Sequence, residues 1–332
     1  MPDPKVWIVV LNWRDAEATA ACLASIGASD YRNFRIVVID NASTDGSVER
    51  FVAMVGIDVI RNSTNLGFTG GVNLGIRQAI AGNADYVWLL NSDATLEPET
   101  LSRLVAAAEA DPSIGLVSPI FCSPSAPGTV EFCLGRFDPA SRTTEQTADI
   151  GVARQWLRDS PKQIVVLGTA LLIRRALIEA IGGLDDQYFA YVEDVDYSLR
   201  SLTAGFRNVV EPGSIVYHQF KTPTENPSDC PPHLHYYMSR NYPLLWRKHF
   251  GSFVFRRSTI WFLHQRLLQV RRLGRDEVGV AALLAGLWDG FIGRGGPFNA
   301  ERQMPWPIRM VMRVLGAVWL RGVVPSGHAG VP

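Results

Sequence analysis

Short apolar runs alternate with helical segments over the first 118 residues, and this alternation limits the folds open to the chain. The runs are rich in Val and Ile and brief, which is typical of strands buried on both faces of a parallel sheet. Each of the first four is followed by a segment with helical spacing, as in a βαβ unit. The pattern predicts a doubly wound α/β sheet flanked by helices, with strands at 6–11, 34–39, 58–61, 86–90 and 114–118, and helices at 16–25, 47–55, 70–81 and 101–110.

Polar side chains follow three of these predicted strands at the point where each strand ends. They are Asn12, Asp40 and the run Asn91, Ser92 and Asp93. Ligands of open α/β sheets bind at the carboxyl ends of the strands, so we expect these side chains to gather at one edge. Asp40 has the chemistry to accept the imide N–H of a uracil or thymine base. The alternative is that residues 40–43 form a turn with capping side chains.

The segment from Asn65 to Gly71 has the composition of a loop that holds phosphate at the start of a helix. It lacks the G-x-G-x-x-G spacing of dinucleotide-binding proteins and the lysine of the P-loop. Close packing of a tight turn explains the same glycines without a ligand. By itself the segment is therefore weak evidence for a nucleotide site.

Asp93 is the first candidate ligand for a divalent cation. Mg²⁺ and Mn²⁺ prefer oxygen ligands, and such an ion neutralises the charge that develops on a departing nucleoside diphosphate. Asn91 is an amide, so the 91–93 motif supplies a single carboxylate. His218 ends a predicted strand and is a second candidate ligand, with a packed core histidine as the alternative. A further alternative is that Asp93 and Thr95 only cap the next helix.

Three carboxylates, Glu193, Asp194 and Asp196, lie within four positions and follow the aromatic segment 188–191. A carboxylate against an apolar wall has a raised pKa and is suited to act as a general base. On a helix Glu193 and Asp196 share a face and Asp194 points elsewhere, which separates a catalytic acid from one that anchors the helix. The alternative is that the acids only stabilise a helix N-terminus.

The rest of the chain contains an irregular segment, a return to the α/β pattern and a helical tail. Pro, Ser, Thr, Gly and charged residues predict a loop-rich insertion at 121–161, which we interpret as a candidate acceptor-side lid. The predicted domains are a catalytic domain at 1–232 and a helical, basic region at 233–332. The remaining predicted elements are strands at 164–173, 208–210 and 215–217, helices at 174–181 and 192–204, and a mobile loop at 223–232.

The formal net charge of the chain is zero, but the charge is divided unevenly. From Arg240 onward 14 Lys or Arg accompany 4 Asp or Glu, a net charge of +10, and the preceding residues carry −10. Such a basic region suits nucleic acid or an anionic membrane, and its many Trp, Phe, Leu and Val residues favour a membrane or a protein partner over nucleic acid. No run of 18 uncharged apolar residues is present, which argues against a spanning helix.

Two further features bear on the compartment. Residues 1–5 lead directly into the first predicted strand and do not resemble a signal peptide. The four cysteines, Cys22, Cys122, Cys133 and Cys230, form no CxxC pair and are typical of free thiols in a reducing cytosol. We therefore expect a cytoplasmic protein that is peripheral on the inner face of the plasma membrane. Packing or homodimerisation through the helical tail is the alternative role for that region.

The ordered set of motifs resembles glycosyltransferase family 2, whose members have the GT-A fold. The resemblance extends over about residues 5–220 and is strongest to the rhamnosyltransferase branch, which builds bacterial cell-wall and surface polysaccharides. The tail pairs Arg240-Asn241 and Arg294-Gly295-Gly296 are similar to that branch as well. The matching pieces are 9–12, 38–46, 65–68, 71–75, 90–93, 182–185, 191–196, Arg200, Gly205 and His218.

The resemblance implies a role for each matched residue. Asp40 contacts the pyrimidine base, and Asp93, in a DXD-type motif, binds the divalent metal and the diphosphate, with His218 near the metal. Asp194 is the base that deprotonates the acceptor hydroxyl, and Glu193 assists it or positions the acceptor. The expected nucleotide-sugar-binding residues are Asn12, Asp40, Asn41, Asn65, Asn73, Asn91, Ser92 and Asp93.

The resemblance also implies inverting transfer by direct displacement, with one base and no covalent intermediate. The QxxRW signature of processive relatives is missing, which predicts the addition of one or a few sugars. The expected donor is dTDP-rhamnose, with UDP-sugars for galactofuranosyl or N-acetylhexosaminyl transfer as the alternative. The expected acceptor is a lipid-linked saccharide or a polysaccharide. A sugar nucleotidyltransferase and a non-catalytic saccharide-binding protein are the alternatives from other classes.

Overall fold

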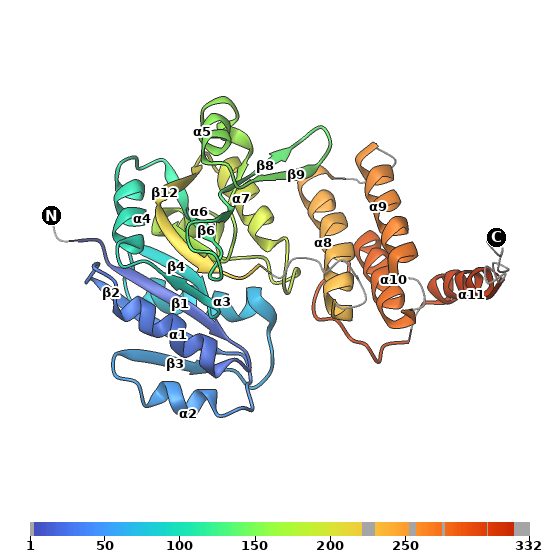
Figure 1. The fold of residues 1–332 in the computed structure, drawn as a ribbon, viewed down its shortest axis with the longest axis horizontal. Coiled ribbons are helices and arrows are strands. Elements are labelled where there is room, and N and C mark those ends of the chain that lie inside the picture. The colour runs from blue at the N-terminus through green and yellow to red at the C-terminus, as the bar shows by residue number, and fades with distance from the viewer. Residues whose placement is uncertain (1–2, 221–229, 252–256, 274–275, 304, 322–332) are drawn as a thin grey trace, which may run out of the picture. The chain divides into compact units, whose positions relative to one another are not determined.

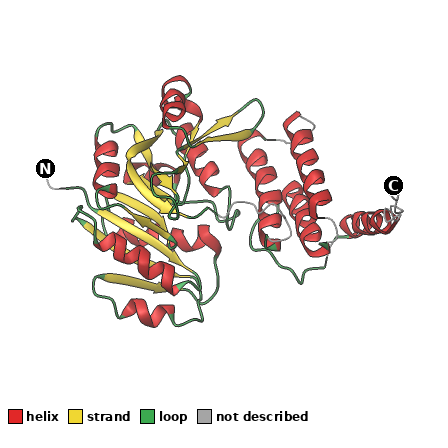
Figure 2. Ribbon diagram, in the orientation of Figure 1, coloured by secondary structure: helices red, strands yellow, loops and turns green. Residues whose placement is uncertain are grey.

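The chain forms two compact units, Met1–Lys221 and Thr222–Pro332 (Figure 1). The first unit is built from strands and helices, and the regular elements in the described residues of the second unit are helices (Figure 2). The functional division at 232/233 stays a prediction, and most of the predicted loop at 223–232 lies outside the described residues. The computed structural model describes residues 3–220, 230–251, 257–273, 276–303 and 305–321.

A mixed sheet of nine strands lies at the centre of the first unit. Its strands are β1 (Val6–Asn12), β2 (Phe34–Asp40), β3 (Ile57–Arg61), β4 (Tyr86–Asn91), β5 (Ala94–Leu96), β6 (Ile114–Cys122), β7 (Val130–Phe132), β11 (Ala170–Arg174) and β12 (Arg207–His218). The order is β3-β2-β1-β4-β11-β6-β12-β5, with β7 paired to β6. The first four strands of this order are parallel, and β11 is antiparallel to both of its neighbours.

Helices cover both faces of this sheet, as a doubly wound fold requires. The helices are α1 (Ala16–Gly27), α2 (Ser47–Val52), α3 (Gly67–Ala81), α4 (Thr100–Glu109), α6 (Arg175–Ile181) and α7 (Glu193–Thr203). Alternate residues of β1 point to opposite faces, so Ile8 packs with the apolar side chains of α1, α2 and α4, whereas Val9 packs with those of α3, α6 and α7. The predicted doubly wound α/β fold is therefore confirmed.

The predicted loop-rich insertion at 121–161 is wrong, because most of this segment is regular structure. It contains the end of β6, β7, a hairpin of β8 (Leu134–Asp138) and β9 (Thr143–Thr147), and α5 (Ile150–Asp159). The hairpin forms a separate small sheet with β10 (Ile164–Val165). β9 reads Thr-Thr-Glu-Gln-Thr, and none of its residues is apolar or fully buried, so it lacks the apolar alternation that marks a strand in sequence.

Two further strand predictions differ from the structure. The predicted strand at 164–173 is interrupted between β10 and β11, because the backbone of that loop is bonded to α7 side chains, with Val166 N donating to Ser198 Oγ (3.1 Å). The two predicted strands at 208–210 and 215–217 are one strand, β12, with an irregular pairing between Glu211 and Ile215. Pro212 and Gly213 lie in that irregularity, which is where a strand tolerates them.

The described part of the second unit consists of four helices, α8 (Pro232–Phe250), α9 (Arg257–Leu273), α10 (Glu277–Ile292) and α11 (Trp306–Arg321). α10 packs closely on α8 through two glycines. A Cβ on Gly286 would collide with the carbonyl oxygen of Tyr236, and one on Gly290 would lie 2.5 Å from that of Arg240. Because backbone atoms cannot move aside, glycine at these positions lets the two helices approach each other.

None of the described helices is long and apolar enough to cross a lipid bilayer.

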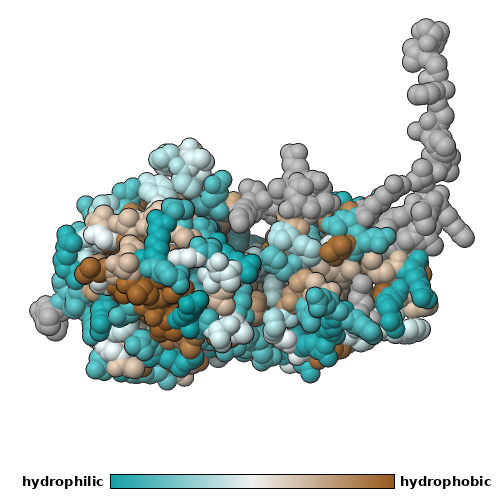
Figure 3. All heavy atoms as spheres, turned by 90° about the horizontal axis from the view of Figure 1, so that it is seen from below, coloured by the Kyte–Doolittle hydropathy of each residue, from teal (hydrophilic) through white to brown (hydrophobic). Residues whose placement is uncertain are grey.

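Apolar side chains also gather on the outer surface of the first unit, as Figure 3 shows from below. Val52 and Val55, at and after the end of α2, have relative exposures of 65% and 101%. β3 is an edge strand of the main sheet, and its Ile57, Val59 and Ile60 are only partly buried. The exposed side chains of β3 itself are the charged Asp58 and Arg61, and a homodimer stays a prediction.

Candidate active site

The carboxyl ends of β1, β2 and β4 form one edge of the main sheet. The strand register sets Asn12 beside Asp40 and Leu11 beside Asn91, so the predicted strand-end residues do gather there. From β1 the chain continues to β2 and β3 on one side, and then crosses through α3 to β4 on the other. This makes the ends of β1 and β4 a topological switch point, where ligands of open α/β sheets bind.

A pocket of about 200 Å³ opens at this switch point. Its lining residues are Leu11, Trp13, Asp15, Phe68, Asn91, Ser92 and Asp93. Trp13 is half exposed, at 50%, and offers an aromatic surface on which a planar base can stack. The pocket therefore combines an aromatic wall with amide, hydroxyl and carboxylate groups, which is the mixture that a polar cofactor-sized ligand needs.

Asn12 and Asp40 are completely buried and bonded within the protein. Asn12 Nδ2 donates to Asp40 Oδ1 (2.8 Å) and to Ser43 Oγ (3.1 Å), and Asn12 Oδ1 accepts from the Thr19 hydroxyl (2.8 Å). Asp40 Oδ2 accepts from Ser43 N (3.0 Å). This geometry is the turn with capping side chains that the sequence also allows. Contact of Asn12 or Asp40 with the donor stays a prediction.

Asn41 and Asn65 stabilise the loop that precedes α3. Asn41 Nδ2 donates to Asn65 Oδ1 (3.1 Å) and to Gly67 O (2.8 Å). Asn41 Oδ1 accepts from Asn62 Nδ2 (2.9 Å) and Leu66 N (3.3 Å), and Asn65 Oδ1 also accepts from Gly67 N (2.8 Å). Both side chains thus shape the loop, and their contact with the donor stays a prediction.

The glycines of this loop are explained by close packing. A Cβ on Gly67, whose φ is +75°, would lie 2.5 Å from the carbonyl oxygen of Phe189, and a Cβ on Gly71 would collide with Leu11. The same Phe189 oxygen accepts a hydrogen bond from Thr69 N (3.2 Å). The start of α3 is therefore a platform for the segment that precedes the acid pair.

Asn73 holds a second point of that segment against α3. Its Nδ2 donates to Leu184 O (2.8 Å) and to Asp186 Oδ1 (2.7 Å), and its Oδ1 accepts from Leu184 N (2.9 Å). Because the side-chain amide is buried and bonded at both ends, the geometry gives Asn73 a positioning role. Contact of Asn73 with the donor stays a prediction.

The backbone just before the acid pair is strained. Phe189, Tyr191 and Val192 have φ angles of +65°, +69° and +71°, a region that bulky and β-branched residues rarely adopt. Such strain costs about 1–3 kcal/mol for each residue and tends to occur where function requires a particular direction of the chain. Val192 immediately precedes α7, so the strained turn sets the direction in which the side chains of Glu193 and Asp194 project from the start of the helix.

The environments of Glu193 and Asp194 differ in hydrogen bonding. Asp194 Oδ2 accepts from Gly168 N (3.1 Å) and its Oδ1 accepts from Val195 N (2.8 Å). Glu193 is 7% exposed, and among the described residues its Oε2 has no hydrogen-bond partner. Burial, followed by the charge of Asp194, raises the pKa of Glu193 well above its ordinary value. Burial also raises the pKa of Asp194, but its backbone hydrogen bonds oppose the rise.

These differences assign the two acids different protonation states. The hydrogen bonds to Asp194 favour its carboxylate form, so Asp194 is the first of the pair to ionise. Once it is charged, its field helps to keep Glu193 protonated. Neighbouring carboxyl groups whose pKa values are driven apart are a common basis for acid and base roles in one site.

Asp196 is the acid that anchors the helix. It is completely buried, and its Oδ2 accepts from Arg200 Nε (2.9 Å). Arg200 also donates to the carbonyl oxygens of Ile181 (2.9 Å) and Gly183 (2.8 Å). This network ties α7 to the end of α6, which separates the structural task of Asp196 from any chemistry at Asp194.

A short loop between β10 and β11 joins the pocket to the acid pair. Thr169 O accepts from Asn91 N (2.8 Å) at the pocket, while the preceding residue, Gly168, donates to Asp194. A Cβ on Gly168 would lie 3.4 Å from Asp194 Cβ and 3.8 Å from the ring of Phe68, which lines the pocket. The pocket and the acid pair therefore belong to one site.

Asp93 and His218 come together across two strands. β12 pairs with β5 so that His218 lies beside Ala94, and His218 Nε2 is 3.2 Å from Asp93 Oδ1. The Asp93 side chain is 46% exposed, and His218 is buried. Within the described residues no group of three His, Cys, Asp or Glu side chains has metal-site geometry. One carboxylate and one imidazole still fit a cation whose other ligands are diphosphate oxygens and water.

Sequence analysis does not identify Trp13, Asp15 and Phe68 as site residues, although all three line the pocket. For Trp13, the feature of the sequence that could have indicated a site residue is its position directly after the buried strand β1. Asp15 is the N-cap of α1 and accepts from Ala18 N (3.2 Å), which would by itself account for its presence. In the sequence, Phe68 is indistinguishable from an aromatic residue of the core, and only the fold shows that it lies beside Gly168.

Solved glycosyltransferases share this architecture. The mannosyltransferase PcManGT from Pyrobaculum calidifontis, in complex with GDP-Man and Mn2+, superposes with a TM-score of 0.55 at 17% identity, covering 96% of this chain and 81% of that one. GalNAc-T7 with UDP, GalNAc and Mn2+ gives 0.54 at 14% identity, covering 81% and 57% of the respective chains. Both likenesses show that the chain shares the GT-A fold of this class of enzymes.

The sequence comparisons place the chain within this class. Residues 2–229 match the family described as "Glycosyltransferase like family 2". The chain therefore belongs to glycosyltransferase family 2, as its motifs predict. It is 28% identical over 234 residues to an N-acetylglucosaminyl-diphospho-decaprenol L-rhamnosyltransferase of Mycobacterium tuberculosis, covering 64% of this chain and 75% of that one. It is also 28% identical over 203 residues to the galactofuranosyltransferase GlfT1 of Mycolicibacterium smegmatis, covering 60% and 66%.

Proposed function

We propose that this glycosyltransferase is inverting and non-processive, and that it transfers rhamnose from dTDP-rhamnose to a hydroxyl group of a lipid-linked or polysaccharide acceptor in cell-wall or surface glycan synthesis. The observation that carries the proposal is the Asp194 carboxylate, which Gly168 holds at the loop joined to the Asp93 pocket. The similarity to a rhamnosyltransferase supports the donor sugar. The similarity to a galactofuranosyltransferase supports a UDP-sugar as the alternative.

The proposed reaction is a single displacement. Asp194 accepts the proton of the acceptor hydroxyl while the hydroxyl oxygen attacks the anomeric carbon. The bond between that carbon and the phosphate oxygen breaks, and the nucleoside diphosphate leaves with the electron pair. Because attack comes from the face opposite the leaving group, the anomeric configuration inverts. Glu193 is protonated and positions the acceptor by donating a hydrogen bond from its buried carboxyl group.

The pocket residues are proposed to hold the donor. Trp13 offers its ring to the pyrimidine, and Asn91 and Ser92 offer amide and hydroxyl groups to the diphosphate. Asp93 and His218 would hold a divalent cation, Mg²⁺ or Mn²⁺, which when bound neutralises the charge on the leaving diphosphate. The Mn²⁺ in the two similar solved structures supports this expectation.

We expect dTDP with Mn²⁺ to stabilise the protein more than either alone. At a nucleotide concentration of about 100 times its Kd, the thermal midpoint should rise by roughly 5 °C or more, because the ligand binds only the folded state. The measurement is a thermal-shift panel of dTDP, UDP, GDP and ADP, with and without Mn²⁺. A larger shift with a purine nucleotide than with dTDP or UDP would contradict the pyrimidine-dependent donor site.

The second unit is proposed to attach the enzyme to an anionic membrane surface. Its net positive charge is complementary to such a surface, and on α11 the exposed apolar residues Trp306, Met310 and Val314 alternate with Arg309 and Arg313. An amphipathic basic helix of this kind binds by charge and by shallow insertion of its apolar side chains. A lipid-linked acceptor would be reached at the same surface.

We expect the full chain to float with anionic liposomes at low salt and to lose most of this binding at high salt. Replacing Arg309 and Arg313 by Gln should weaken binding roughly thirtyfold, because each of the two cations near the surface contributes about 1 kcal/mol. The same change at Arg35 and Arg61, two exposed cations of the first unit, is the matched control. Binding that ignores both salt and lipid charge would instead favour a packing role for α11.

A further inference from the structure

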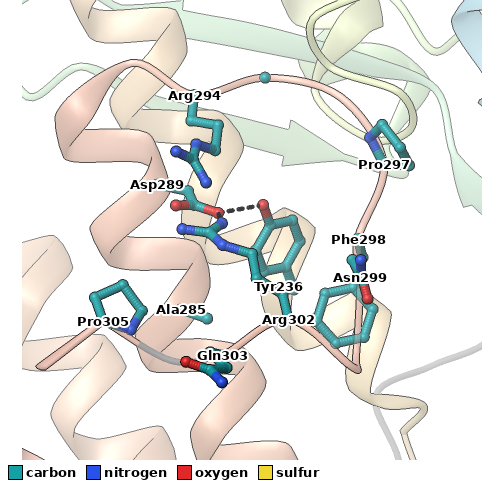
Figure 4. Close-up of a pocket in the computed structure, with 11 residues that line it drawn as sticks. Tyr236, Ala285, Asp289, Arg294, Pro297, Phe298, Asn299, Arg302, Gln303 and Pro305 are labelled. Atoms are coloured by element: carbon teal, nitrogen blue, oxygen red, sulfur yellow. Dashed lines mark hydrogen bonds and ion pairs between the residues drawn. The ribbon is translucent and has the colours of Figure 1, made fainter. Parts of the chain in front are cut away.

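A second pocket lies within the helical unit, between α8, α10 and the segment that follows α10 (Figure 4). Its volume is about 270 Å³. Tyr236 on α8, Asp289 on α10, and Arg294, Phe298 and Arg302 on the following segment all line it. All of its lining residues belong to the second unit, and the reaction proposed above gives this pocket no role.

The segment that closes the pocket is anchored at several points. Arg294 N donates to Asp289 O (2.7 Å), and Phe298 N donates to the Tyr237 hydroxyl (2.8 Å). Arg240, which is completely buried, donates to the carbonyl oxygen of Gly296. These bonds fix the segment on α8 and α10, so the pocket is a preformed feature of this unit.

Asp289 is the buried carboxylate among the residues that line this pocket. It is completely buried, and its Oδ2 accepts from the Tyr236 hydroxyl (2.7 Å) and from Arg302 Nη1 (2.6 Å). Its Oδ1 has no hydrogen-bond partner among the described residues. A buried acceptor without a donor costs about 1–3 kcal/mol, and more when it is charged. Because Asp289 lines the pocket, its unpaired oxygen points to a ligand that donates a hydrogen bond to it.

The neighbouring groups narrow the chemistry of that ligand. A simple anion has no donor for Asp289 Oδ1, and a metal ion would face the guanidinium groups of Arg294 and Arg302. A sugar hydroxyl both donates and accepts, so it matches a carboxylate beside guanidinium groups. The rings of Tyr236 and Phe298, with centroids 4.8 Å apart, add the apolar surface that the C–H face of a sugar ring packs against.

We propose that this pocket binds one sugar residue of the acceptor glycan, with Asp289 Oδ1 accepting from a sugar hydroxyl and Arg294 donating to another. The inference rests on the proposed function for the identity of the glycan. The pocket volume suits a single sugar ring, because sites for larger ligands start at about 300 Å³. The pocket would give the enzyme an acceptor subsite that is separate from the donor site and its acid pair.

The test is saturation-transfer NMR on the full chain with N-acetylglucosamine and methyl α-rhamnoside, in the presence of saturating dTDP and Mn²⁺ to fill the donor site. We expect at least one of these sugars to bind to the wild-type protein. Asp289→Asn should weaken this binding about tenfold or more, because the Asn side chain is uncharged and can place an NH₂ group where the sugar hydroxyl needs an acceptor. Arg294→Gln changes an exposed side chain, so it should weaken binding without affecting folding. Arg272→Gln, at another exposed arginine of the same unit, is the matched control and should bind as the wild type does.

Two results would overturn the proposal. One is that neither sugar receives saturation from the wild-type protein, and the other is that both pocket variants bind the sugar as tightly as the Arg272→Gln control. The thermal shift with dTDP and Mn²⁺ is measured on the same samples. If the wild-type protein binds neither sugar but keeps its nucleotide shift, the result counts against the pocket alone, whereas sugar binding by the wild type without any nucleotide shift counts against the proposed function.

Discussion

Asp194→Asn is expected to lower kcat by on the order of a hundredfold or more while leaving the binding of dTDP and Mn²⁺ largely unchanged. The amide has nearly the same shape as the carboxylate, and its oxygen can still accept from Gly168 N. What it loses is the ability to take a proton from the acceptor hydroxyl. The measurements are steady-state kinetics with the donor identified by the thermal-shift panel, and the nucleotide shift of the variant itself.

The pH dependence gives a second signature of the same residue. Activity requires the Asp194 carboxylate, so the wild-type rate should rise with pH until this group is ionised. Because burial raises the pKa of Asp194, that rise should occur above the range of an ordinary aspartate. The residual activity of Asp194→Asn should lack this rise. Full activity in the variant, or an unchanged acid limb, would show that another group is the base.

The free energy of unfolding should fall as pH rises, whereas the reaction rate should increase. A raised pKa in the folded state means that the folded protein binds the proton more tightly than the unfolded chain does. Asp194 and Glu193 therefore destabilise the fold as pH rises from the ordinary carboxyl range through their raised pKa values. Asp194→Asn removes one of these contributions, so at pH 8 its thermal midpoint should be no lower than that of the wild type.

Two neighbouring acids serve as comparisons for this variant. Glu193→Gln should reduce kcat less than Asp194→Asn does, because Glu193 is assigned a protonated, positioning role. Asp196→Asn should lower the thermal midpoint, since it leaves Arg200 without its buried carboxylate partner. The three acids of the motif would then separate into a base, a positioning group and a structural anchor.

The regular part of the α/β fold was predictable because its signals are local. β1 and β4 are continuous runs of Val, Ile, Leu, Tyr and Trp, β2 has such a run at 36–39, and each strand ends at a polar residue. β5 is different, because it has three residues and is defined by pairing with β12, more than a hundred residues away. Nothing within such a short strand marks it, so only the assembled sheet shows that His218 meets Asp93.

The site was predictable to the extent that polar residues directly follow strands or begin helices. Sequence placed Asp93 and Asp194 as candidates, and the structure brings them into one site through the loop that contains Gly168. The sequence does not show whether the side-chain amide of an asparagine points into the site or bonds within the protein. Asn12 and Asn73 are bonded to partners 28 and 111 positions away, and these long-range hydrogen bonds give them a structural task that no local pattern indicates.

Asp93→Asn is the change with the second large expected effect. We expect it to abolish most of the extra thermal stabilisation that Mn²⁺ adds to dTDP, and to lower kcat/KM by on the order of a hundredfold, because charge on the leaving diphosphate is then less well neutralised. Asn91→Asp should act in the other direction and lower the Mn²⁺ concentration needed for half-maximal activity, since it adds a carboxylate to the same pocket.

The matched control for Asp93→Asn is Asp58→Asn. Asp58 has a similar exposed fraction, 48% against 46%, and a similar distance to a basic side chain, 3.3 Å to Arg35 against 3.2 Å between Asp93 and His218. It lies on β3, outside the pocket, so its loss should change neither the Mn²⁺ effect nor the kinetics. If Asp93→Asn and Asp58→Asn behave alike, the diphosphate is not bound at Asp93. If Asp93→Asn lowers activity but the Mn²⁺ effect persists, the cation has other ligands, and Asp93 acts on the donor directly.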